Sequence, residues 1–366
     1  MSKKLVFGLL GLMLAVVALY GCGKAVEQKQ AVGNATLTGY VYAADGTTPL
    51  GGVHVWTTGS IIETYSNADG SWTLNNVPLY SAVEAKTVYA ETGSWKISFQ
   101  ATAEVGKTAS VPASKTTFSK DNLTAPVDVA VIKGSYDRIE DIVTKLGFTY
   151  TTLEVSDLAN YAYISTFEAI FINCGASTYS FDSTAKANLK KFIEEGGKSL
   201  YASDWAAEFV EDVWPGAIDF YGSDATPESS PEDVDNAKVG MGSTSVEARV
   251  TDTILKNNVL SKEVVSIYYD LGGWVVISAE GTGTDVLLRG TPEVYAFSVN
   301  TLSNRVRPTS SVTAYAFLDN EPLAVRFMPA GDTKGTVFYT TFHNEAQEEK
   351  VSADAKKILN YFIMNL

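Results

Sequence analysis

From Val127 onward, short apolar runs alternate with amphipathic segments, and this alternation strongly restricts the possible folds. The run VDVAVIKG at residues 127–134 is almost wholly apolar, as in a parallel strand that is buried on both faces. The next segment, residues 136–147, carries its apolar residues at helical spacing and ends at a glycine. Because this order of strand and helix recurs, we expect right-handed crossovers and a doubly wound α/β sheet of the flavodoxin-like type.

The same rhythm predicts the other elements of the α/β domain, which we place at residues 127–366. Strands are expected at residues 148–155, 167–175, 198–205 and 335–344, and helices at 182–197 and 352–366. Between them, an acidic, Pro/Ser-rich loop precedes strand-like runs at 261–281, 284–290, 310–318 and 323–331. We expect these runs to form an antiparallel extension of the sheet before its last strand.

Residues 35–126 follow a period of two residues instead, which is typical of half-buried strands. Two Asp-Gly pairs, at Asp45 and Asp69, separate these strands and indicate tight turns. The pattern predicts a small all-β sandwich. Composition, charge and period all change near Pro126, so we place a domain boundary there and expect the two domains to fold independently.

The first residues predict export and lipid attachment. Lys3 and Lys4 precede an apolar stretch of about 15 residues, which is short for a membrane span and fits a signal peptide at residues 1–21. The sequence LYGC that follows resembles the bacterial lipobox, so Cys22 is the expected lipidation site; an uncleaved anchor helix is the alternative. Residues 22–34 are polar and read as a tether. Resemblance to Gram-negative lipoproteins implies a cell-envelope protein, anchored in the outer membrane.

Charge and cysteine content argue against nucleic acid as a partner and against an intramolecular disulfide. Residues 127–366 carry 19 basic and 34 acidic side chains, a net charge of −15. Such a surface repels phosphate backbones, so nucleic acid is not expected as a partner. With Cys22 lipidated, Cys174 is the only other cysteine, and no intramolecular disulfide can form.

Polar and small residues follow the predicted parallel strands, at the edge where doubly wound sheets bind ligands. We therefore predict a crevice at the carboxyl ends of the strands. Its candidate residues are Gly134, Ser135, Cys174, Gly175, Ser203, Asp204, His343, Asn344 and Glu345.

The N-terminal strands resemble the carboxypeptidase regulatory-like (transthyretin-like) module. The matching residues are Gly39, Val41, Asp45, Gly46, Pro49, Leu50, Gly52, Val53, Val55, Asp69, Gly70, Trp72, Leu74, Val77 and Pro78. The resemblance implies a structural or spacer role without catalytic residues. His54 alternates with Val53 and Val55, so we expect it on the outer face of a strand.

The order of elements after Val127 resembles the class I glutamine amidotransferase-like fold. In that family a cysteine flanked by glycines forms a strained turn after the fourth strand, the nucleophile elbow, and a late His-Pro-Glu supplies the base. His343 and Glu345 match the late pair, with Asn344 in place of proline. The elbow falls on Ala202-Ser203-Asp204, which lacks both the cysteine and the glycines.

Two function classes follow. The first is a non-catalytic, lipid-anchored envelope protein with a spacer sandwich and an acidic α/β domain that binds an envelope protein or a small ligand. The second is an envelope hydrolase or amidase in which His343 and Glu345 activate Ser203 or Cys174. The missing elbow glycines favour the first class, with His343 as a hydrogen-bonded structural residue. No cofactor is expected, and His343 with Asp204, Glu208 and Glu345 lacks the spacing of a metal site.

Overall fold

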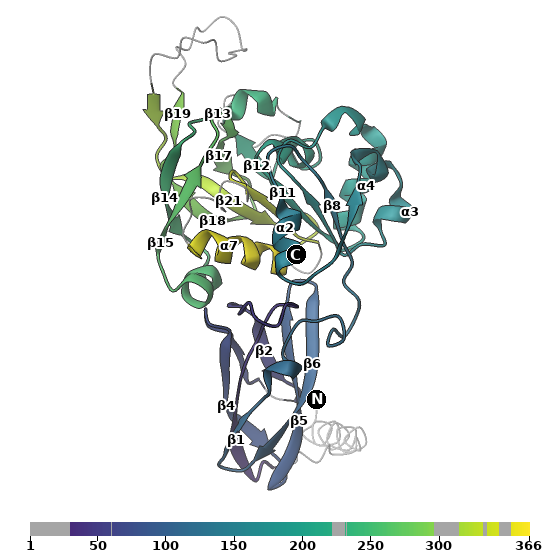
Figure 1. Cartoon of the computed structure of the whole chain (residues 1–366), viewed down its shortest axis with the longest axis vertical. Helices are drawn as coiled ribbons and strands as arrows, with labels where there is room; N and C mark the ends of the chain where they lie inside the picture. Colours follow the sequence, from purple (N-terminus) through teal and green to yellow (C-terminus); the bar gives the residue numbers. More distant parts are fainter. Residues whose placement is uncertain are drawn as a thin grey trace, which may run out of the picture.

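The computed structural model describes residues 30–59, 61–221, 231, 233–295, 315–331, 335–343 and 353–366. The predicted signal peptide with Cys22, most of the tether, Asn344 and Glu345 lie outside these residues. Figure 1 shows two parts in series, an all-strand N-terminal part and a larger mixed α/β part. Within the described ranges, no helix combines the length and apolar character that crossing a membrane requires.

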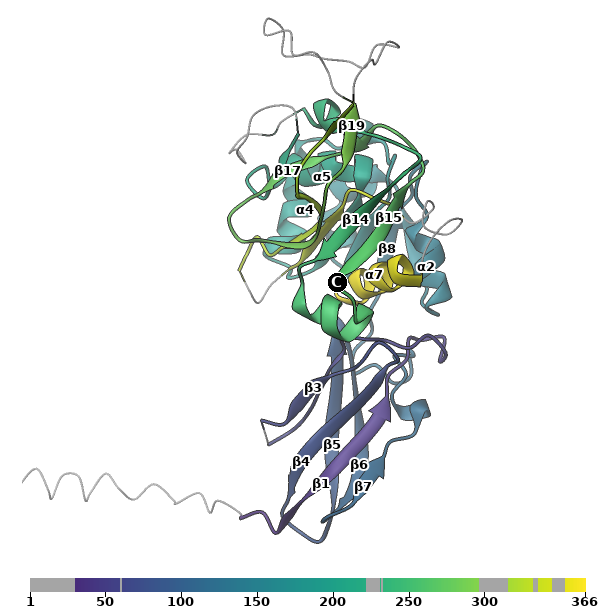
Figure 2. The ribbon, with the colours of Figure 1, turned by 90° about the vertical axis from the view of Figure 1, so that its left-hand side faces the viewer.

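The N-terminal part consists of two small sheets (Figure 2). One has the order β4-β1-β7, with β1 (Gly33–Tyr40), β4 (Ser71–Leu79) and β7 (Thr108–Ser110). The other has the order β3-β2-β5-β6, with β2 (His54–Thr57), β3 (Glu63–Tyr65), β5 (Val83–Thr92) and β6 (Trp95–Glu104). Trp72 of the first sheet contacts Phe99 of the second, with ring centroids 6.1 Å apart, so the two sheets share one apolar core.

Both Asp-Gly pairs form the turns that the sequence predicts. The Asp45 carboxylate accepts hydrogen bonds from the backbone N–H groups of Thr47 and Thr48. Gly70 has a φ of +78°, and a Cβ there would approach the Val41 carbonyl oxygen to 2.5 Å. Glycine is therefore required at this turn both for its conformation and for its lack of a side chain.

Five parallel strands form the centre of the α/β part, in the order β9-β8-β10-β11-β22. They are β8 (Val129–Ile132), β9 (Tyr150–Leu153), β10 (Ala169–Ile172), β11 (Ser199–Ser203) and β22 (Val337–Thr340). This is the flavodoxin-like strand order, which confirms the predicted doubly wound sheet. The chain reverses its direction across the sheet between β8 and β10, and the topological switch point lies there.

Helices cover both faces of these strands. Helices α2 (Ile139–Lys145) and α7 (Ala353–Met364) pack on one face, and α3 (Tyr161–Ile164), α4 (Ser183–Glu194) and α5 (Ala207–Glu211) on the other. Phe171 of β10 belongs to the apolar cluster of the first face, whereas Ile170 and Ile172 belong to the second. Burial on both faces explains why the strand sequences are continuously apolar.

The predicted antiparallel extension is confirmed in part: residues 244–250 were not predicted as a strand, and residues 315–317 join a separate sheet. Beyond β22 the sheet continues through β21 (Glu321–Phe327), β18 (Thr284–Gly290), β14 (Thr244–Val250) and β15 (Val264–Tyr269). Two smaller sheets lie beside it. They contain β12 (Ile218–Phe220) with β17 (Ile277–Glu280), and β13 (Lys238–Gly240), β16 (Trp274–Val275), β19 (Glu293–Tyr295) and β20 (Tyr315–Phe317).

The run at 261–281, predicted as strand throughout, forms three separate strands. Gly273 has a φ of +81°, which turns the chain between β15 and β16, and β16 then pairs with β13 instead of continuing the main sheet. Of the predicted strand at 310–318, only residues 315–318, which include β20, lie within the described residues.

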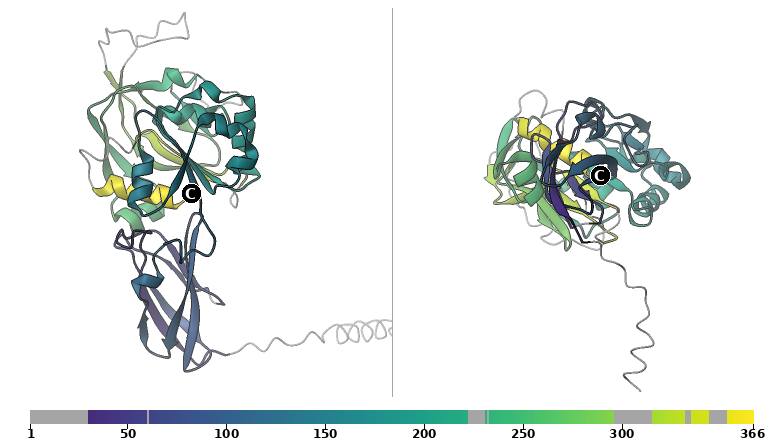
Figure 3. Two further views of the ribbon diagram at one scale, coloured as in Figure 1. Left: turned by 45° about the vertical axis from the view of Figure 1, so that its right-hand side comes forward. Right: turned by 90° about the horizontal axis from the view of Figure 1, so that it is seen from below.

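The two parts of the molecule contact each other closely. Ser94 donates its backbone N–H to the Leu366 carbonyl oxygen at 2.6 Å, and the rings of Trp95 and Phe148 lie 4.0 Å apart. Figure 3 shows the C-terminal end of α7 at this junction. The Asp45 N–H also donates to the Leu146 carbonyl oxygen, just before β9 begins. The N-terminal part therefore docks at the amino ends of the parallel strands, and their carboxyl ends face away from it (Figure 1).

Candidate functional site

A pocket with a volume of about 240 Å³ lies at the carboxyl ends of the parallel strands. It is formed by the segments that follow β8, β10, β11 and β22, together with the turn between β15 and β16. Its lining residues are Tyr136, Cys174, Asp204, Trp205, Leu271, Gly272, Trp274 and His343. The pocket thus adjoins the topological switch point, where doubly wound sheets bind their ligands.

Two glycines allow the segments after β8 and β10 to meet beside this pocket. A Cβ on Gly134 would lie 2.1 Å from the Cys174 carbonyl oxygen, which no real side chain could tolerate. Gly175 has a φ of +82°, and a Cβ there would lie 2.7 Å from the Tyr136 ring. Both predicted crevice glycines therefore shape the pocket, while Ser135 is exposed at its edge.

Asp204 occupies the turn from β11 into the following helical segment, η4 (Asp204–Ala206). Its φ is +46°, a conformation that few residues other than glycine adopt. The side chain is only 3% exposed, and its Oδ1 accepts a hydrogen bond from the Val275 N–H at 2.7 Å. Tyr339 donates to the Asp204 carbonyl oxygen at 2.8 Å. Asp204, the last of the three residues at the predicted elbow, is thus held in place by hydrogen bonds to its carboxylate and to its backbone carbonyl.

Ser203 is the last residue of β11 and is completely buried. Its hydroxyl donates to Asp137 Oδ2 at 2.5 Å and accepts from the Cys174 N–H at 3.0 Å. The Ser203 hydroxyl thus connects the ends of neighbouring strands. Because Ser203 does not line the pocket, its hydroxyl is not presented to a substrate there.

Cys174 lines the pocket, and its thiol donates a hydrogen bond to Asp204 Oδ2 at 3.4 Å. Burial raises the pKa of this thiol, and the negative charge of Asp204 raises it further. A thiol must ionise to act as a nucleophile. Both effects favour the protonated form of the Cys174 thiol, which is the less reactive one.

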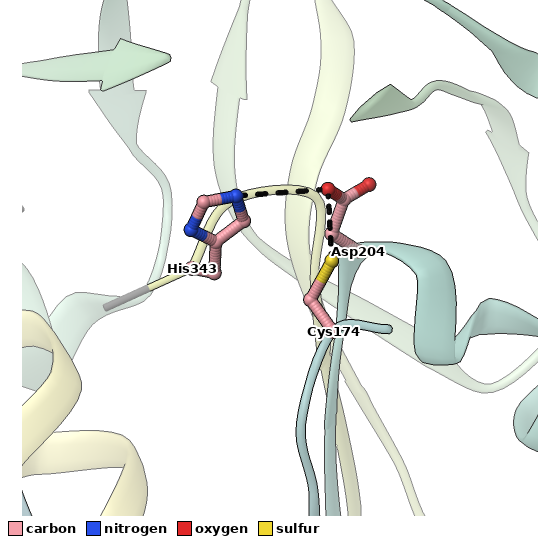
Figure 4. A group of neighbouring side chains, drawn as sticks. All are labelled: Cys174, Asp204 and His343. Atoms are coloured by element: carbon pink, nitrogen blue, oxygen red, sulfur yellow. Dashed lines mark hydrogen bonds and ion pairs between the residues drawn. The ribbon is translucent and has the colours of Figure 1, made fainter. Parts of the chain in front are cut away.

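His343 follows β22 and is 5% exposed. Its Nε2 lies 3.9 Å from Asp204 Oδ2 and 3.9 Å from Asp270 Oδ1, both beyond hydrogen-bond distance. Its Nδ1 is buried and has no hydrogen-bond partner in the described part of the chain. The sequence predicted that His343 would be a hydrogen-bonded structural residue, but within the described residues neither distance nor Nδ1 supports such a hydrogen bond. Figure 4 shows the ring, the Asp204 carboxylate and the Cys174 thiol pointing toward one another.

The electrostatics of the group are dominated by the loss of water. Burial raises the pKa of Asp204 to about 7, although the charge of His343, the Val275 N–H, the Cys174 thiol and the charge of Lys238 all oppose this rise. The carboxylate thus carries a desolvation penalty that its hydrogen bonds only partly offset.

The structure brings together three of the predicted residues, Cys174, Asp204 and His343, and places Ser203 behind them. Asn344 and Glu345 lie outside the described residues, and Glu208 does not line the pocket. Sequence reasoning missed the aromatic walls and one acid, which are Tyr136, Trp205, Trp274 and Asp270. Trp205 is the last residue of one predicted strand and Tyr136 lies two residues beyond the end of another, which is a usable signal. Trp274 and Asp270 belong to the antiparallel extension, and no local sequence pattern shows that this segment returns to the pocket.

The second histidine of the chain lies far from this pocket, in β2. The ring of His54 stacks between those of Trp56 and Tyr65, at centroid distances of 4.6 and 5.1 Å. Its Nε2 lies 3.0 Å from Glu63, while Val53 and Val55 on either side are buried. The predicted alternation of this strand is confirmed.

No protein-family profile and no curated protein matches the sequence. Similar solved structures include a protein described as ThuA-like from Bacteroides uniformis, with 12% identity and a TM-score of 0.41 over 65% of this chain and 91% of that one. A protein from Thermoplasma acidophilum that is described as a GMP synthase subunit has 10% identity and a TM-score of 0.38 over 66% and 94%. The glutaminase domain of Trypanosoma brucei CTPS has 12% identity and a TM-score of 0.37 over 66% and 94%.

These structures include ThuA-like and class I glutamine amidotransferase-like folds, and each covers about two thirds of this chain. At such identities and TM-scores no residue role passes from them to this protein. The assignment of the fold rests on the strand order of the chain itself.

Proposed function

We propose that this protein is a lipid-anchored cell-envelope protein whose acidic α/β domain binds a small ligand in the pocket at the switch point. In this proposal the α/β domain is a class I glutamine amidotransferase-like domain without the family's nucleophile. The N-terminal strands are a carboxypeptidase regulatory-like module that acts as a spacer, and Cys22 carries the lipid.

One observation carries the binding role. His343 is almost completely buried and borders the pocket, yet its Nδ1 has no hydrogen-bond partner among the described residues, and its Nε2 comes no closer than 3.9 Å to the Asp204 and Asp270 carboxylates. Buried polar groups are nearly always paired, because an unpaired one costs about 1–3 kcal/mol. A ligand in the pocket would supply the missing partner.

The geometry disfavours hydrolysis by serine or cysteine. A working nucleophile and its base must lie within hydrogen-bond reach of each other. The Ser203 hydroxyl is used by Asp137 and the Cys174 N–H, and the Cys174 thiol donates to Asp204. An envelope hydrolase remains the second candidate for a different reason: a carboxylate at a positive-φ turn, with a histidine 3.9 Å away, could itself act as the nucleophile.

The purified full chain distinguishes these functions. We expect no labelling by fluorophosphonate or iodoacetamide probes and no turnover of glutamine or simple esters. We also expect that some amino acids, sugars or metal ions raise the melting temperature, and that His343→Ala removes this effect. Turnover that is lost in Ser203→Ala, Cys174→Ala or Asp204→Asn would overturn the non-catalytic function.

Anchoring is tested separately, by labelling cells with radioactive palmitate. The expected result is labelled protein for the natural chain, and uncleaved, unlabelled precursor for Cys22→Ser, because the acyl chains are attached to this cysteine. Two or three such chains hold a lipoprotein stably in a membrane. Labelling that survives Cys22→Ser would show that the lipid is attached elsewhere or that no lipobox operates.

A further inference from the structure

We propose that Cys174, Asp204 and His343 bind one divalent transition-metal ion of the zinc class and leave one coordination position open toward the pocket. This inference names the ligand class of the pocket and so rests on the binding function proposed above. The sequence predicted no metal site, because the combination considered there joined His343 to acidic residues only and left out the cysteine.

The three donor atoms are spaced nearly as a zinc ion requires. They lie within 4.8 Å of one another, with Cys174 Sγ 3.4 Å from Asp204 Oδ2 and His343 Nε2 3.9 Å from the same oxygen. Tetrahedral bonds of about 2.0–2.3 Å place such pairs of donors about 3.4–3.6 Å apart. The Cys174–Asp204 pair already has this spacing. To complete the site, the imidazole must move by roughly half an ångström toward Asp204 and by up to about 1.2 Å toward Cys174.

The chemical types of the donors select the metal. A thiolate sulfur, an imidazole nitrogen and one carboxylate oxygen suit zinc and its neighbours in the transition series. Magnesium and calcium prefer sites made of oxygen atoms alone, so they fit poorly here. Thiolate and carboxylate together carry two negative charges, which a divalent ion neutralises in a buried site.

A neighbouring backbone group holds one donor in place, as hydrogen-bonding groups do around established metal sites, whereas His343 Nδ1 has no such partner among the described residues. The Val275 N–H occupies Asp204 Oδ1 and leaves Oδ2 free to face the cysteine and the histidine. Asp270 Oδ1 lies 3.9 Å from His343 Nε2, near enough to accept a hydrogen bond from a water molecule on the metal.

Three protein donors beside an open volume of about 240 Å³ match the pattern of zinc sites that keep one position for water or a ligand. On binding, the S–H bond of Cys174 breaks and its proton leaves to solvent, while new bonds form from the metal to sulfur, oxygen and nitrogen. No electron is transferred in this step. The acidic surface of the α/β domain further raises the local concentration of cations.

Titration of the metal-free full chain with Co²⁺ tests the inference. We expect one equivalent to bind and to produce the near-ultraviolet absorption of a thiolate–cobalt bond, which added Zn²⁺ then abolishes. Cys174→Ser should remove the absorption, and Asp204→Asn and His343→Ala should each weaken cobalt binding by at least about tenfold. The control His54→Ala, which changes the only other histidine, should bind cobalt like the natural protein.

Circular dichroism of each variant shows whether it is folded, so that lost binding cannot be mistaken for unfolding. Absence of the absorption in the natural protein, or its survival in Cys174→Ser, overturns the metal site. If organic ligands nevertheless stabilise the protein through His343, the binding function stands without the metal. If neither metals nor organic ligands bind, both proposals fail.

Discussion

Asp204 combines three properties that seldom occur together: a positive φ, almost complete burial and a carboxylate side chain. Strained backbone persists only where the surroundings enforce it, and such positions concentrate at functional sites. Here the Val275 N–H and the Tyr339 hydroxyl enforce it from two different strands. A glycine or an asparagine would adopt this positive-φ turn without burying a charge, so the presence of an acid indicates a role for its charge.

Ser203 has a structural role that predicts a measurable loss of stability. Its hydroxyl satisfies both Asp137 and the Cys174 N–H inside the protein. Ser203→Ala should lower the free energy of unfolding by about 1–3 kcal/mol, because both groups are left without this partner. Urea denaturation measures this loss. The control Ser245→Ala, on an exposed face of β14, should change it by no more than about 0.5 kcal/mol. Equal effects of the two substitutions would contradict the assigned role.

Glu321, the first residue of β21, predicts a specific pH dependence of stability. Burial raises its pKa from the usual 4.5 to about 7; Arg289 opposes the rise, and Asp319, Glu280 and Asp219 add to it. The folded protein therefore holds this proton more tightly than the unfolded chain does. The resulting destabilisation is absent below the unfolded pKa and is complete above the folded one.

Replacing Glu321 by glutamine should remove this effect. Glu321→Gln should be more stable than the natural protein at about pH 8, and the difference should vanish at about pH 4. Urea denaturation at several pH values measures it, with the exposed Glu247→Gln as the matched control. A difference that is constant across this range would show that the carboxyl keeps its ordinary pKa.

At the scale of elements, the approach of the segments after β8 and β10 determines the shape of the pocket. Gly134→Ala would force a Cβ against the Cys174 carbonyl oxygen, which is backbone and can move only with the whole segment. We expect a loss of about 1–3 kcal/mol in stability, together with loss of ligand or metal binding. Urea denaturation and cobalt titration measure the two effects.

Gly197→Ala is the matched control for this substitution. No atom lies within 4 Å of a Cβ at Gly197, and only its φ of +66° opposes a side chain. It should lose about 1 kcal/mol and keep its ligand binding. If Gly134→Ala binds as well as this control does, the close approach of the two segments is not needed for the pocket.

The sequence predicted most elements and their order, because continuous apolar runs such as 129–132 reflect burial on both faces. It also placed Cys174, Asp204 and His343 at strand ends that share one edge. It could not show that Asp204, rather than Ser203, faces the pocket, because that depends on the conformation of a single turn residue. Nor could it show that Trp274 lines the pocket and that Asp270 lies beside His343, since both residues reach this place through long-range pairing of the extension.

At the scale of the molecule, the junction between the two parts predicts how they depend on each other. The Trp95–Phe148 ring contact and the Ser94–Leu366 hydrogen bond join them, and one apolar cluster includes residues from both. Residues 127–366 alone should still unfold cooperatively, because the main sheet is covered on both faces, but at a lower temperature than the whole chain. Thermal unfolding followed by circular dichroism compares the two.

A disordered 127–366 fragment would show that the boundary near Pro126, or the division into two domains, is wrong. An unchanged melting temperature would show that the junction contributes nothing to stability. Phe148→Ala in the whole chain serves as the matched variant, since it removes one side of the ring contact and leaves both parts present.

The N-terminal part docks at the amino ends of the parallel strands, on the side opposite the pocket. Its first strand, β1, begins at the end of this part that lies farthest from the α/β part (Figure 2). Strands β5 and β6 contain ten residues each, which span roughly 30 Å. If the chain is anchored at Cys22, the pocket stands more than three screening lengths above the lipid headgroups, since that length is about 8 Å at physiological ionic strength. What reaches the pocket would then depend on the charge of the protein itself and not on the lipid composition beneath it.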